Sequence, residues 1–262
     1  MSMAALRDGP RTGFLARTRR WLGPPFAGIN DYEYKVRSQN GEDGILAALF
    51  RSLGTSRGYG VEFGVGDGSE CNLAHLVKDR GWWGLMMEAD RHSFERLREE
   101  YRSVPNVTAA NEVVAAENVA ALFARYQVPM TFDLLSIDVD GNDYWIWRAL
   151  GAYRPQVVVI EYNAAHPPPE KWVMEYNPRH RWDGTTYYGA SLTSLTALGR
   201  QLGYALVGTD MRGVNAFFVS RDALQRVRFP ELPPEKSYHP AGFFNQHGTI
   251  GHPQGEGPFI RV

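Results

Sequence analysis

A short apolar run that ends in three alternating glycines is the feature that most constrains the fold. Residues 59–63 are mainly apolar, as in a buried strand, and Gly64, Gly66 and Gly68 follow at once. From Asn72 the sequence regains helical potential. Glycines allow a sharp turn and a close approach by a ligand, and free N–H groups at a helix start can hold anionic or polar groups. The stretch therefore predicts a strand, a turn and a helix that together bind a nucleotide-like ligand.

The spacing of the glycines separates two classes of nucleotide-binding enzyme. Dinucleotide enzymes use G-x-G-x-x-G, but Ser69 stands where their third glycine would be, and Gly68 comes one residue early. Glu62, two positions before the first glycine, completes the pattern acid-x-G-x-G-x-G. This pattern resembles motif I of the class I S-adenosylmethionine (SAM) methyltransferases. SAM carries a sulfonium and an ammonium group, which suit nearby carboxylates better than a pyrophosphate does. A nicotinamide enzyme and a turn without a chemical role are the alternatives.

Polar residues near the following strands extend the predicted cofactor site. Glu88 ends the apolar run 83–88 and lies 24 residues beyond Gly64, close to the ~20 expected of an acid that binds a ribose diol. A surface carboxylate is its alternative role. Asn111 ends a third predicted strand, where its amide could recognise adenine. The residues predicted to bind the cofactor are Gln39, Glu62, Gly64, Gly66, Gly68, Ser69, Glu88, Asn111 and Asp138.

The alternation of strands and helices predicts a doubly wound α/β domain with right-handed crossovers. Strands are expected over 59–63, 83–88, 106–111, 131–138, 157–161, 204–208 and 215–219. Helices are expected over 72–80, 92–101, 118–126, 144–150 and 191–202, and one that Ser38 caps and that runs through Phe50. Segment 38–44 either only caps and packs or closes over the cofactor. We expect a Rossmann-like class I methyltransferase fold, with a mostly parallel seven-stranded sheet, an antiparallel C-terminal hairpin and helices on both faces.

The composition limits the partners and the location of the protein. The 262 residues carry a net charge of −1, which gives no reason to expect a nucleic-acid partner. No apolar run approaches the ~18 residues that a membrane span needs. A single cysteine, Cys71, excludes an internal disulfide and fits a reducing cytoplasm.

We expect a basic extension over 1–35, a methyltransferase domain over 36–222 and a capping tail over 223–262. The extension, with five arginines against Asp8 before residue 30, is either a tail or a short basic helix that contacts a membrane surface or a partner.

Acidic residues follow the predicted fourth and fifth strands. Ligands of open α/β sheets bind outside the carboxyl ends of the strands, where Asp138, Asp140, Asp143 and Glu161 should meet. A methyl transfer from SAM needs an aligned acceptor oxygen that loses its proton. Carboxylates can supply a general base or bind Mg²⁺, which lowers the pKa of a bound hydroxyl. Alternatively, Asp140 and Asp143 cap the helix that begins at Tyr144.

The segment Asp138-Val139-Asp140-Gly141-Asn142-Asp143 resembles the D-V-E-G-x-E segment of FkbM-type sugar and macrolide O-methyltransferases. The similarity extends from segment 38–43 through 61–68 to Ile160-Glu161. Asp140-Gly141-Asn142-Asp143 is also similar to the D-G-S-H segment of metal-dependent macrolide-sugar O-methyltransferases, in which the acid binds the metal and the histidine is the base. The resemblance implies Mg²⁺ ligands at Asp140 and Glu161, with Asn163 in place of a second acid. Asp143, which replaces the histidine, Asp138 and His166 are the catalytic candidates.

An aromatic segment over 164–190 interrupts the alternation and predicts a lid over the acceptor. Its rings suit the C–H faces of sugars, and its polar residues suit hydroxyls. A macrolide or aromatic acceptor, or a homodimer interface, would suit the same composition. The predicted substrate contacts are Trp172, Tyr176, Trp182, Tyr187 and Tyr188.

The sequence thus predicts a SAM-dependent O-methyltransferase for a hydroxyl of a sugar or oligosaccharide. An O-methyltransferase for a non-sugar natural product is the first alternative. A silent SAM- or glycan-binding protein is the second, although such a protein would not need the acid cluster.

Overall fold

The computed structural model of the chain describes residues 28–245 and 248–262. Most of the predicted basic extension lies outside these residues. The main sheet contains β1 (Tyr59–Phe63), β2 (Trp83–Glu88), β3 (Val107–Asn111), β4 (Thr131–Ile137), β5 (Arg154–Glu161), β7 (Tyr204–Thr209) and β8 (Asn215–Ser220). The helices are η1 (Ile29–Tyr32), α2 (Glu42–Leu53), α3 (Ala74–Asp79), α4 (Arg91–Glu100), α5 (Val119–Arg125), α6 (Asp143–Ala149), α7 (Leu192–Leu202), α8 (Arg221–Leu224) and α9 (Pro234–Ser237).

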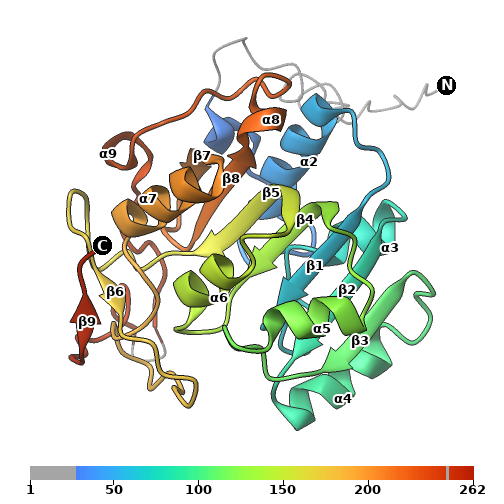
Figure 1. Cartoon of the computed structure of the whole chain (residues 1–262), viewed down its shortest axis with the longest axis horizontal. Helices are drawn as coiled ribbons and strands as arrows, with labels where there is room; N and C mark the ends of the chain where they lie inside the picture. The colour runs from blue at the N-terminus through green and yellow to red at the C-terminus, as the bar shows by residue number, and fades with distance from the viewer. Residues whose placement is uncertain (1–27, 246–247) are drawn as a thin grey trace, which may run out of the picture.

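The seven strands are ordered β3-β2-β1-β4-β5-β8-β7 (Figure 1). The first five run parallel, and β8 pairs antiparallel with both β5 and β7. This arrangement confirms the predicted Rossmann-like class I methyltransferase fold. The direction of winding reverses between β1 and β4, which places the expected ligand site outside the carboxyl ends of these two strands.

Each face of the sheet has its own apolar core, because successive strand residues point to opposite faces. In β4, Leu134 packs with α2, α3 and α4, whereas Leu135 packs with α5, α6 and α7. Both leucines are fully buried. The parallel strands therefore have apolar residues on both sides, as is usual for a sheet with helices on both faces.

The start of α2 agrees with the prediction only in part. The helix begins at Glu42 and its N-cap residue is Gly41, not Ser38, but the Ser38 hydroxyl still accepts a hydrogen bond of 3.2 Å from the backbone N–H of Asp43 in the first turn. In return, the carboxylate of Asp43 accepts hydrogen bonds of 2.7 Å each from the backbone N–H groups of Val36, Arg37 and Ser38. The acid in the first turn thus joins the helix to the preceding loop.

A second, two-stranded sheet joins the aromatic segment to the C-terminal tail. β6 (Val173–Met174) pairs antiparallel with β9 (Phe259–Ile260), and both are too short to be seen as a periodic pattern. The N–H of Glu175 also donates to Pro258 O at 3.0 Å, and that of Thr186 to Pro253 O at 2.9 Å. The tail therefore fixes the position of the aromatic segment. Within residues 28–245 and 248–262, no helix combines the length and apolarity that crossing a membrane requires.

Candidate active site

The glycine turn after β1 lies directly against the end of β4. Gly64 has a φ of +68°, and a Cβ at this position would lie 1.6 Å from the carbonyl oxygen of Asp138. Only glycine fits this contact. Gly66 has a φ of +56°, but a Cβ there would meet no atom within 4 Å. Gly66 therefore leaves open space at the turn, whereas Gly64 brings the turn and the acidic segment together.

The two acids predicted to bind the cofactor accept hydrogen bonds from the backbone. Glu62 accepts from the N–H groups of Asn72 at 2.9 Å and Leu73 at 2.7 Å. Burial raises the pKa of Glu62 to about 7, although these bonds favour the charged form. Glu88 accepts from Gly66 N at 2.8 Å and from Asp90 N at 2.7 Å. Both carboxylates shape the turn and its surroundings, and a direct contact with a cofactor stays a prediction.

The other predicted cofactor residues have local partners or are exposed. The amide of Asn111 donates to Glu88 O at 2.8 Å, which fixes it beside the end of β2. The hydroxyl of Ser69 donates to Asp67 at 2.6 Å, and Gln39 is exposed in the loop before α2. Their roles in cofactor binding stay predictions.

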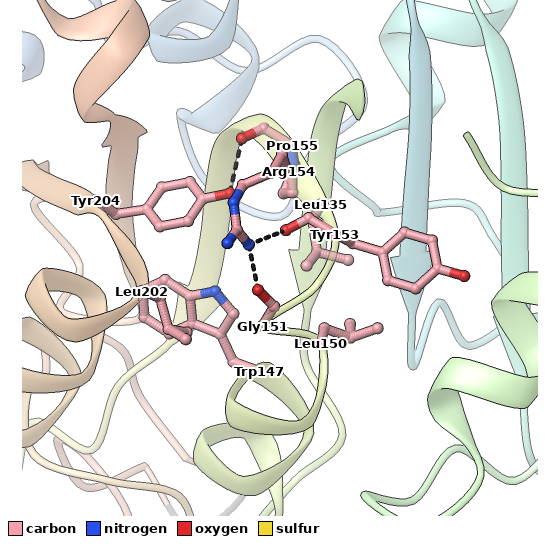
Figure 2. Close-up of a pocket in the computed structure, with 9 residues that line it drawn as sticks. All are labelled: Leu135, Trp147, Leu150, Gly151, Tyr153, Arg154, Pro155, Leu202 and Tyr204. Atoms are coloured by element: carbon pink, nitrogen blue, oxygen red, sulfur yellow. Dashed lines mark hydrogen bonds between the residues drawn. The ribbon is translucent and has the colours of Figure 1, made fainter. Parts of the chain in front are cut away.

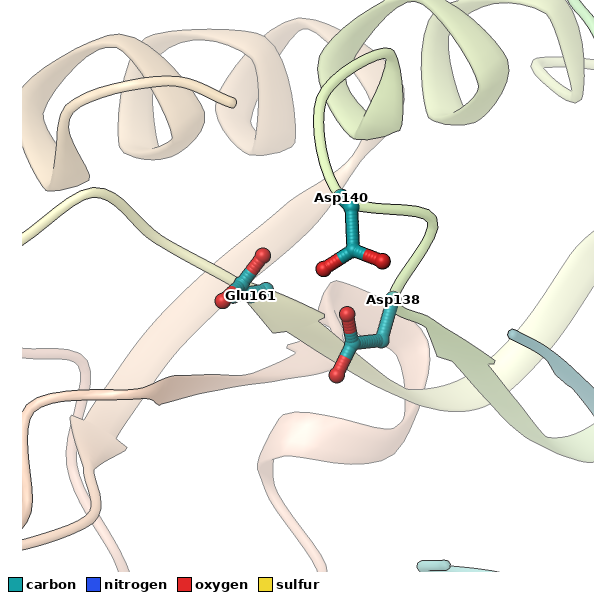
Figure 3. A group of neighbouring side chains, drawn as sticks. All are labelled: Asp138, Asp140 and Glu161. Carbon is teal, nitrogen blue, oxygen red and sulfur yellow. The ribbon is translucent and has the colours of Figure 1, made fainter. Parts of the chain in front are cut away.

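Asp138, Asp140 and Glu161 form a cluster at the carboxyl ends of β4 and β5 (Figure 3). One carboxylate oxygen from each lies within 4.8 Å of the other two. Asp140 is exposed, and Asp138 and Glu161 are half-buried. Within the described part of the chain, none of the three carboxylates accepts a hydrogen bond or pairs with a cation, and Oε2 of Glu161 is buried without a partner. The sequence predicted Asp140 and Glu161 as metal ligands, and the structure places the carboxylate of Asp138 beside theirs.

Burial and mutual repulsion disfavour the charged forms of this cluster. Burial, followed by the charges of Asp140 and Asp143, raises the pKa of Asp138 well above its usual value. Burial and the charge of Asp138 do the same for Glu161. Burial raises the pKa of Asp140 to about 6, with a further contribution from Asp143. Three carboxylates in this arrangement need protons or a cation between them.

Asp143 shapes the loop that carries Asp140. Its buried carboxylate accepts from Val139 N and Gly141 N, both at 2.9 Å. Asp140 has a φ of +55°, a conformation that few residues other than glycine, asparagine and aspartate adopt. Neither Asp140 nor Asp143 is the N-cap of α6, which is Asn142 without a side-chain cap bond, but Asp143 lies in the first turn of this helix, as the alternative expected of an acid at its N-terminus. The role of Asp143 as a base stays a prediction, and its observed contacts are structural.

Asn163 and His166 have partners that hold the aromatic segment. The Asn163 amide donates to the carbonyl oxygens of Thr186 and Tyr188, both at 2.8 Å. The His166 ring stacks on Trp172 at 4.2 Å, and its Nδ1 lies 3.2 Å from Glu170 Oε1. Metal binding by Asn163 and catalysis by His166 stay predictions, and neither residue is free of other contacts.

The predicted substrate residues differ in how close they lie to the acid cluster. Tyr188 is buried, and burial together with the charges of Glu161, Asp138 and Asp143 raises its phenol pKa well above the usual value. Trp172 is buried, and Tyr187 donates to Pro258 O at 2.8 Å. Tyr176 donates to Glu117, and Trp182 donates to Thr185 O at 2.8 Å and is partly exposed. Contact with a substrate stays a prediction for all five.

His180 was not among the sequence-based candidates. Its ring lies against Gly141, where a Cβ would come within 2.5 Å of its Cδ2 and 3.0 Å of its Nε2. Burial lowers the pKa of His180, although the charges of Asp183 and Asp140 favour its protonated form. The segment around His180 has no motif, so only the tertiary contact shows its position.

A recess at the other end of the sheet is not part of this site. It has no internal room for even a water molecule, and its lining includes Trp147, Leu150, Arg154 and Tyr204 (Figure 2). Arg154 begins β5 and Tyr204 begins β7, opposite the carboxyl ends that carry the acids. The hydroxyl of Tyr204 donates to Pro155 O at 2.9 Å, so the recess has a structural explanation.

Comparison with known proteins gives only distant likenesses. No protein-family model matches the chain, and no curated protein sequence matches it. The N-terminal domain of EvdMO1 with SAH bound is 13% identical, with a TM-score of 0.46 over 79% of this chain and 95% of that chain. A putative sarcosine dimethylglycine methyltransferase from Galdieria sulphuraria is 13% identical, with a TM-score of 0.42 over 70% and 66%. M. jannaschii TYW2 in complex with AdoMet is 12% identical, with a TM-score of 0.37 over 67% and 75%. These likenesses are too weak to assign an activity.

Proposed function

We propose that the protein is a SAM-dependent O-methyltransferase that acts on a hydroxyl group of a sugar or oligosaccharide. One observation supports this proposal most. Three carboxylates without donors in the described chain stand where the glycine turn meets β4, at the point where the sheet reverses its direction of winding. A group transfer requires that donor and acceptor lie close together in a fixed geometry. The contact between Gly64 and Asp138 would hold the cofactor turn and the acceptor site next to each other in this way.

The glycine turn fits SAM. The positive φ of Gly66 and the open space around it leave room for a ligand that a side chain would fill. Residues 64–69 of the turn, Glu88 and Asn111 would hold the cofactor, as the sequence predicts. SAM would supply an electrophilic methyl group at this edge of the sheet.

The acid cluster fits a divalent cation such as Mg²⁺. Mg²⁺ prefers oxygen ligands, and Asp138, Asp140 and Glu161 offer three within 4.8 Å of one another. A cation would remove the repulsion that raises their pKa values and would lower the pKa of a bound hydroxyl. The pKa of about 6 for Asp140 in the protein alone places a proton acceptor near neutral pH at the same position.

The residues of the site would divide the work of the transfer. The backbone of the turn would hold the cofactor, and the cluster would bind the acceptor oxygen and receive its proton. The aromatic segment would exclude water and orient the acceptor, since Tyr188 lies close enough to the acids to respond to their charges.

The aromatic segment is the reason to test a carbohydrate acceptor first. Aromatic rings such as Trp182, which is 37% exposed, can stack on the C–H faces of a sugar. A resemblance to the methylmannose polysaccharide 1-O-methyltransferase type, which no single motif carries, makes mannosides the first acceptors to try. A macrolide, a phenol and a silent binding protein are the alternatives, and a homodimer in the cytoplasm stays a prediction.

The proposal can be tested with labelled SAM and an acceptor panel of methyl glycosides, mannose oligosaccharides, a macrolide and a catechol. We expect label in a carbohydrate, and loss of turnover in chelator that Mg²⁺ restores. Calorimetry should show binding of SAM and not of NAD. Binding of NAD without SAM would overturn the proposal, while label only in the macrolide or catechol would replace the acceptor class. Light scattering would measure the oligomeric state.

A further inference from the structure

The aromatic segment contains two histidines in very different surroundings. His166 has a stacking partner in Trp172 and an acidic partner in Glu170. The Nε2 of His180 is buried and has no hydrogen-bond partner in the part of the chain that the structure describes. A buried polar atom without a partner is costly, and in native proteins it calls for an explanation.

Backbone contacts fix the position of His180 over the acidic loop. Asn142 donates through its Nδ2 to Asn177 O at 2.8 Å, and the N–H of His180 donates to the same oxygen at 2.9 Å. The N–H of Gly189 donates to Gly141 O at 3.1 Å. The loop after β4 and the aromatic segment are therefore joined by hydrogen bonds at two points, one of them in the turn that carries His180. The ring is held against Gly141 and is not an incidental surface group.

The chemistry of the neighbours selects the kind of group that can satisfy Nε2. The carboxylates of the cluster can only accept hydrogen bonds when charged, and a neutral imidazole nitrogen either donates or accepts according to its tautomer. A hydroxyl group can do both, so it can bind to Nε2 in either tautomer and to a carboxylate at the same time. A buried histidine nitrogen beside Asp140 is therefore suited to an alcohol ligand.

We propose that His180 is a substrate-binding residue whose Nε2 holds a hydroxyl group of the acceptor beside Asp140. This assignment rests on the proposed function and adds the contact that would orient the acceptor from the lid side. It makes the aromatic segment a source of polar specificity as well as of ring contacts. An acceptor that lacks the bound hydroxyl should be discriminated against mainly by His180.

The test compares H180L and H180Q with wild type, using the acceptor that takes up most label in the panel above. We expect H180L to raise the acceptor KM about tenfold, the effect of one lost hydrogen bond in a closed site. The acceptor Kd measured by calorimetry with SAH present should rise equally. H180Q keeps a polar atom and should recover part of the affinity. The Kd of SAH should not change, whereas the Tm of H180L should fall with the loss of the ring contact to Tyr187 and of the hydrogen bond to the Asp140 backbone.

Two further variants separate the possible outcomes. H92L is the control for loss of a histidine, since His92 is exposed on α4, and it should behave as wild type. H166Q tests the other histidine of the aromatic segment. An active wild type with an unchanged KM in H180L would overturn the role of His180 alone, as would a KM effect confined to H166Q. A wild type that neither binds SAM nor labels any acceptor would overturn the proposed function and this role with it.

Discussion

Acidic side chains lie on both sides of the contact between Gly64 and Asp138, and the two groups differ in the hydrogen bonds that their carboxylates accept. Glu62 and Glu88, on the side of the glycine turn, each accept two hydrogen bonds from backbone N–H groups. Asp138, Asp140 and Glu161, on the other side, accept none from the described residues.

The difference separates carboxylates that serve the fold from carboxylates available to a ligand. Those of the first group are part of the backbone structure, and their loss would leave N–H groups unpaired. Those of the second group repel one another and gain only when a cation, a proton or a ligand joins them. Mutations on the two sides should therefore have opposite effects on stability and turnover.

The largest effect is expected for D140N. Asparagine tolerates the positive φ of Asp140 and keeps the shape of the side chain, but it loses the charge. Turnover should fall about 100-fold or more, as for other lost acid–base or metal-binding groups, while SAH affinity is unchanged. Kinetics with labelled SAM and calorimetry with SAH measure the two quantities. Equal losses in both would mean that Asp140 belongs to the cofactor site.

Removal of a backbone-bound acid should instead affect stability. E62L leaves the N–H groups of Asn72 and Leu73 without their acceptor. Urea unfolding should show a loss of about 2 kcal/mol or more. D140N serves as the comparison, since it removes repulsion and should leave the free energy of unfolding equal or higher. A stable E62L protein would show that these hydrogen bonds contribute little.

Divalent cations should bind to the cluster of Asp138, Asp140 and Glu161 and thereby stabilise the folded protein. Mg²⁺ or Mn²⁺ at about 100 times its Kd should raise the Tm of wild type by roughly 5 °C. The shift should disappear in E161Q and persist in E175Q, which changes an exposed acid outside the cluster. Differential scanning calorimetry with and without chelator measures it. A shift of the same size in E161Q would place the cation elsewhere.

A methyl group at the open glycine should weaken the binding of the cofactor. G66A should bind SAH about tenfold less tightly, a loss of roughly 1.4 kcal/mol. G54A is a matched control, because Gly54 also has a positive φ and open space around it but ends α2. Both variants carry the same backbone strain. A G54A protein with equally weak SAH binding would show that strain, and not the lost space, is the cause.

The smallest effect is expected for the pH dependence of stability in chelator. The pKa of Asp140 is raised to about 6, above its value of ~3.9 in an unfolded chain. An acid whose pKa is higher in the folded state binds its proton more tightly there. The folded protein therefore loses stability as the pH rises from about 4 to about 6. The Tm of wild type should fall relative to that of D140N across this window and then stay level. Exposure of Asp140 keeps the effect small. A Tm difference that does not depend on pH would contradict the raised pKa.

The sequence predicted the frame of the fold because local patterns determine it. The apolar strands and their order along the chain were recognisable, and β2 and α7 lie within one residue of their predicted bounds. Ser38 is not the N-cap residue of α2, because the helix begins only at Glu42, but its hydroxyl accepts a hydrogen bond from the N–H of Asp43 in the first turn. The β6–β9 pair was missed because each strand has only two residues and the partners are far apart in sequence.

The site could be predicted less fully than the fold. Asp140 and Glu161 were expected together, and the strand order brings them together. The backbone bonds of Asp143 depend on the conformation of Asp140, which residue types alone do not reveal. His180 was missed because its position depends on the docking of Asn177 against Asn142, a contact between distant segments without a motif.

The pairing of β6 with β9 also sets an order of assembly during synthesis. Chains are made from the N-terminus, and every strand of the main sheet precedes β9 in the sequence. The glycine turn and the acid cluster can therefore form before β9 has left the ribosome, whereas the aromatic segment cannot take its final place. If the protein is the proposed methyltransferase, a nascent chain would acquire the means to bind SAM before it could select an acceptor.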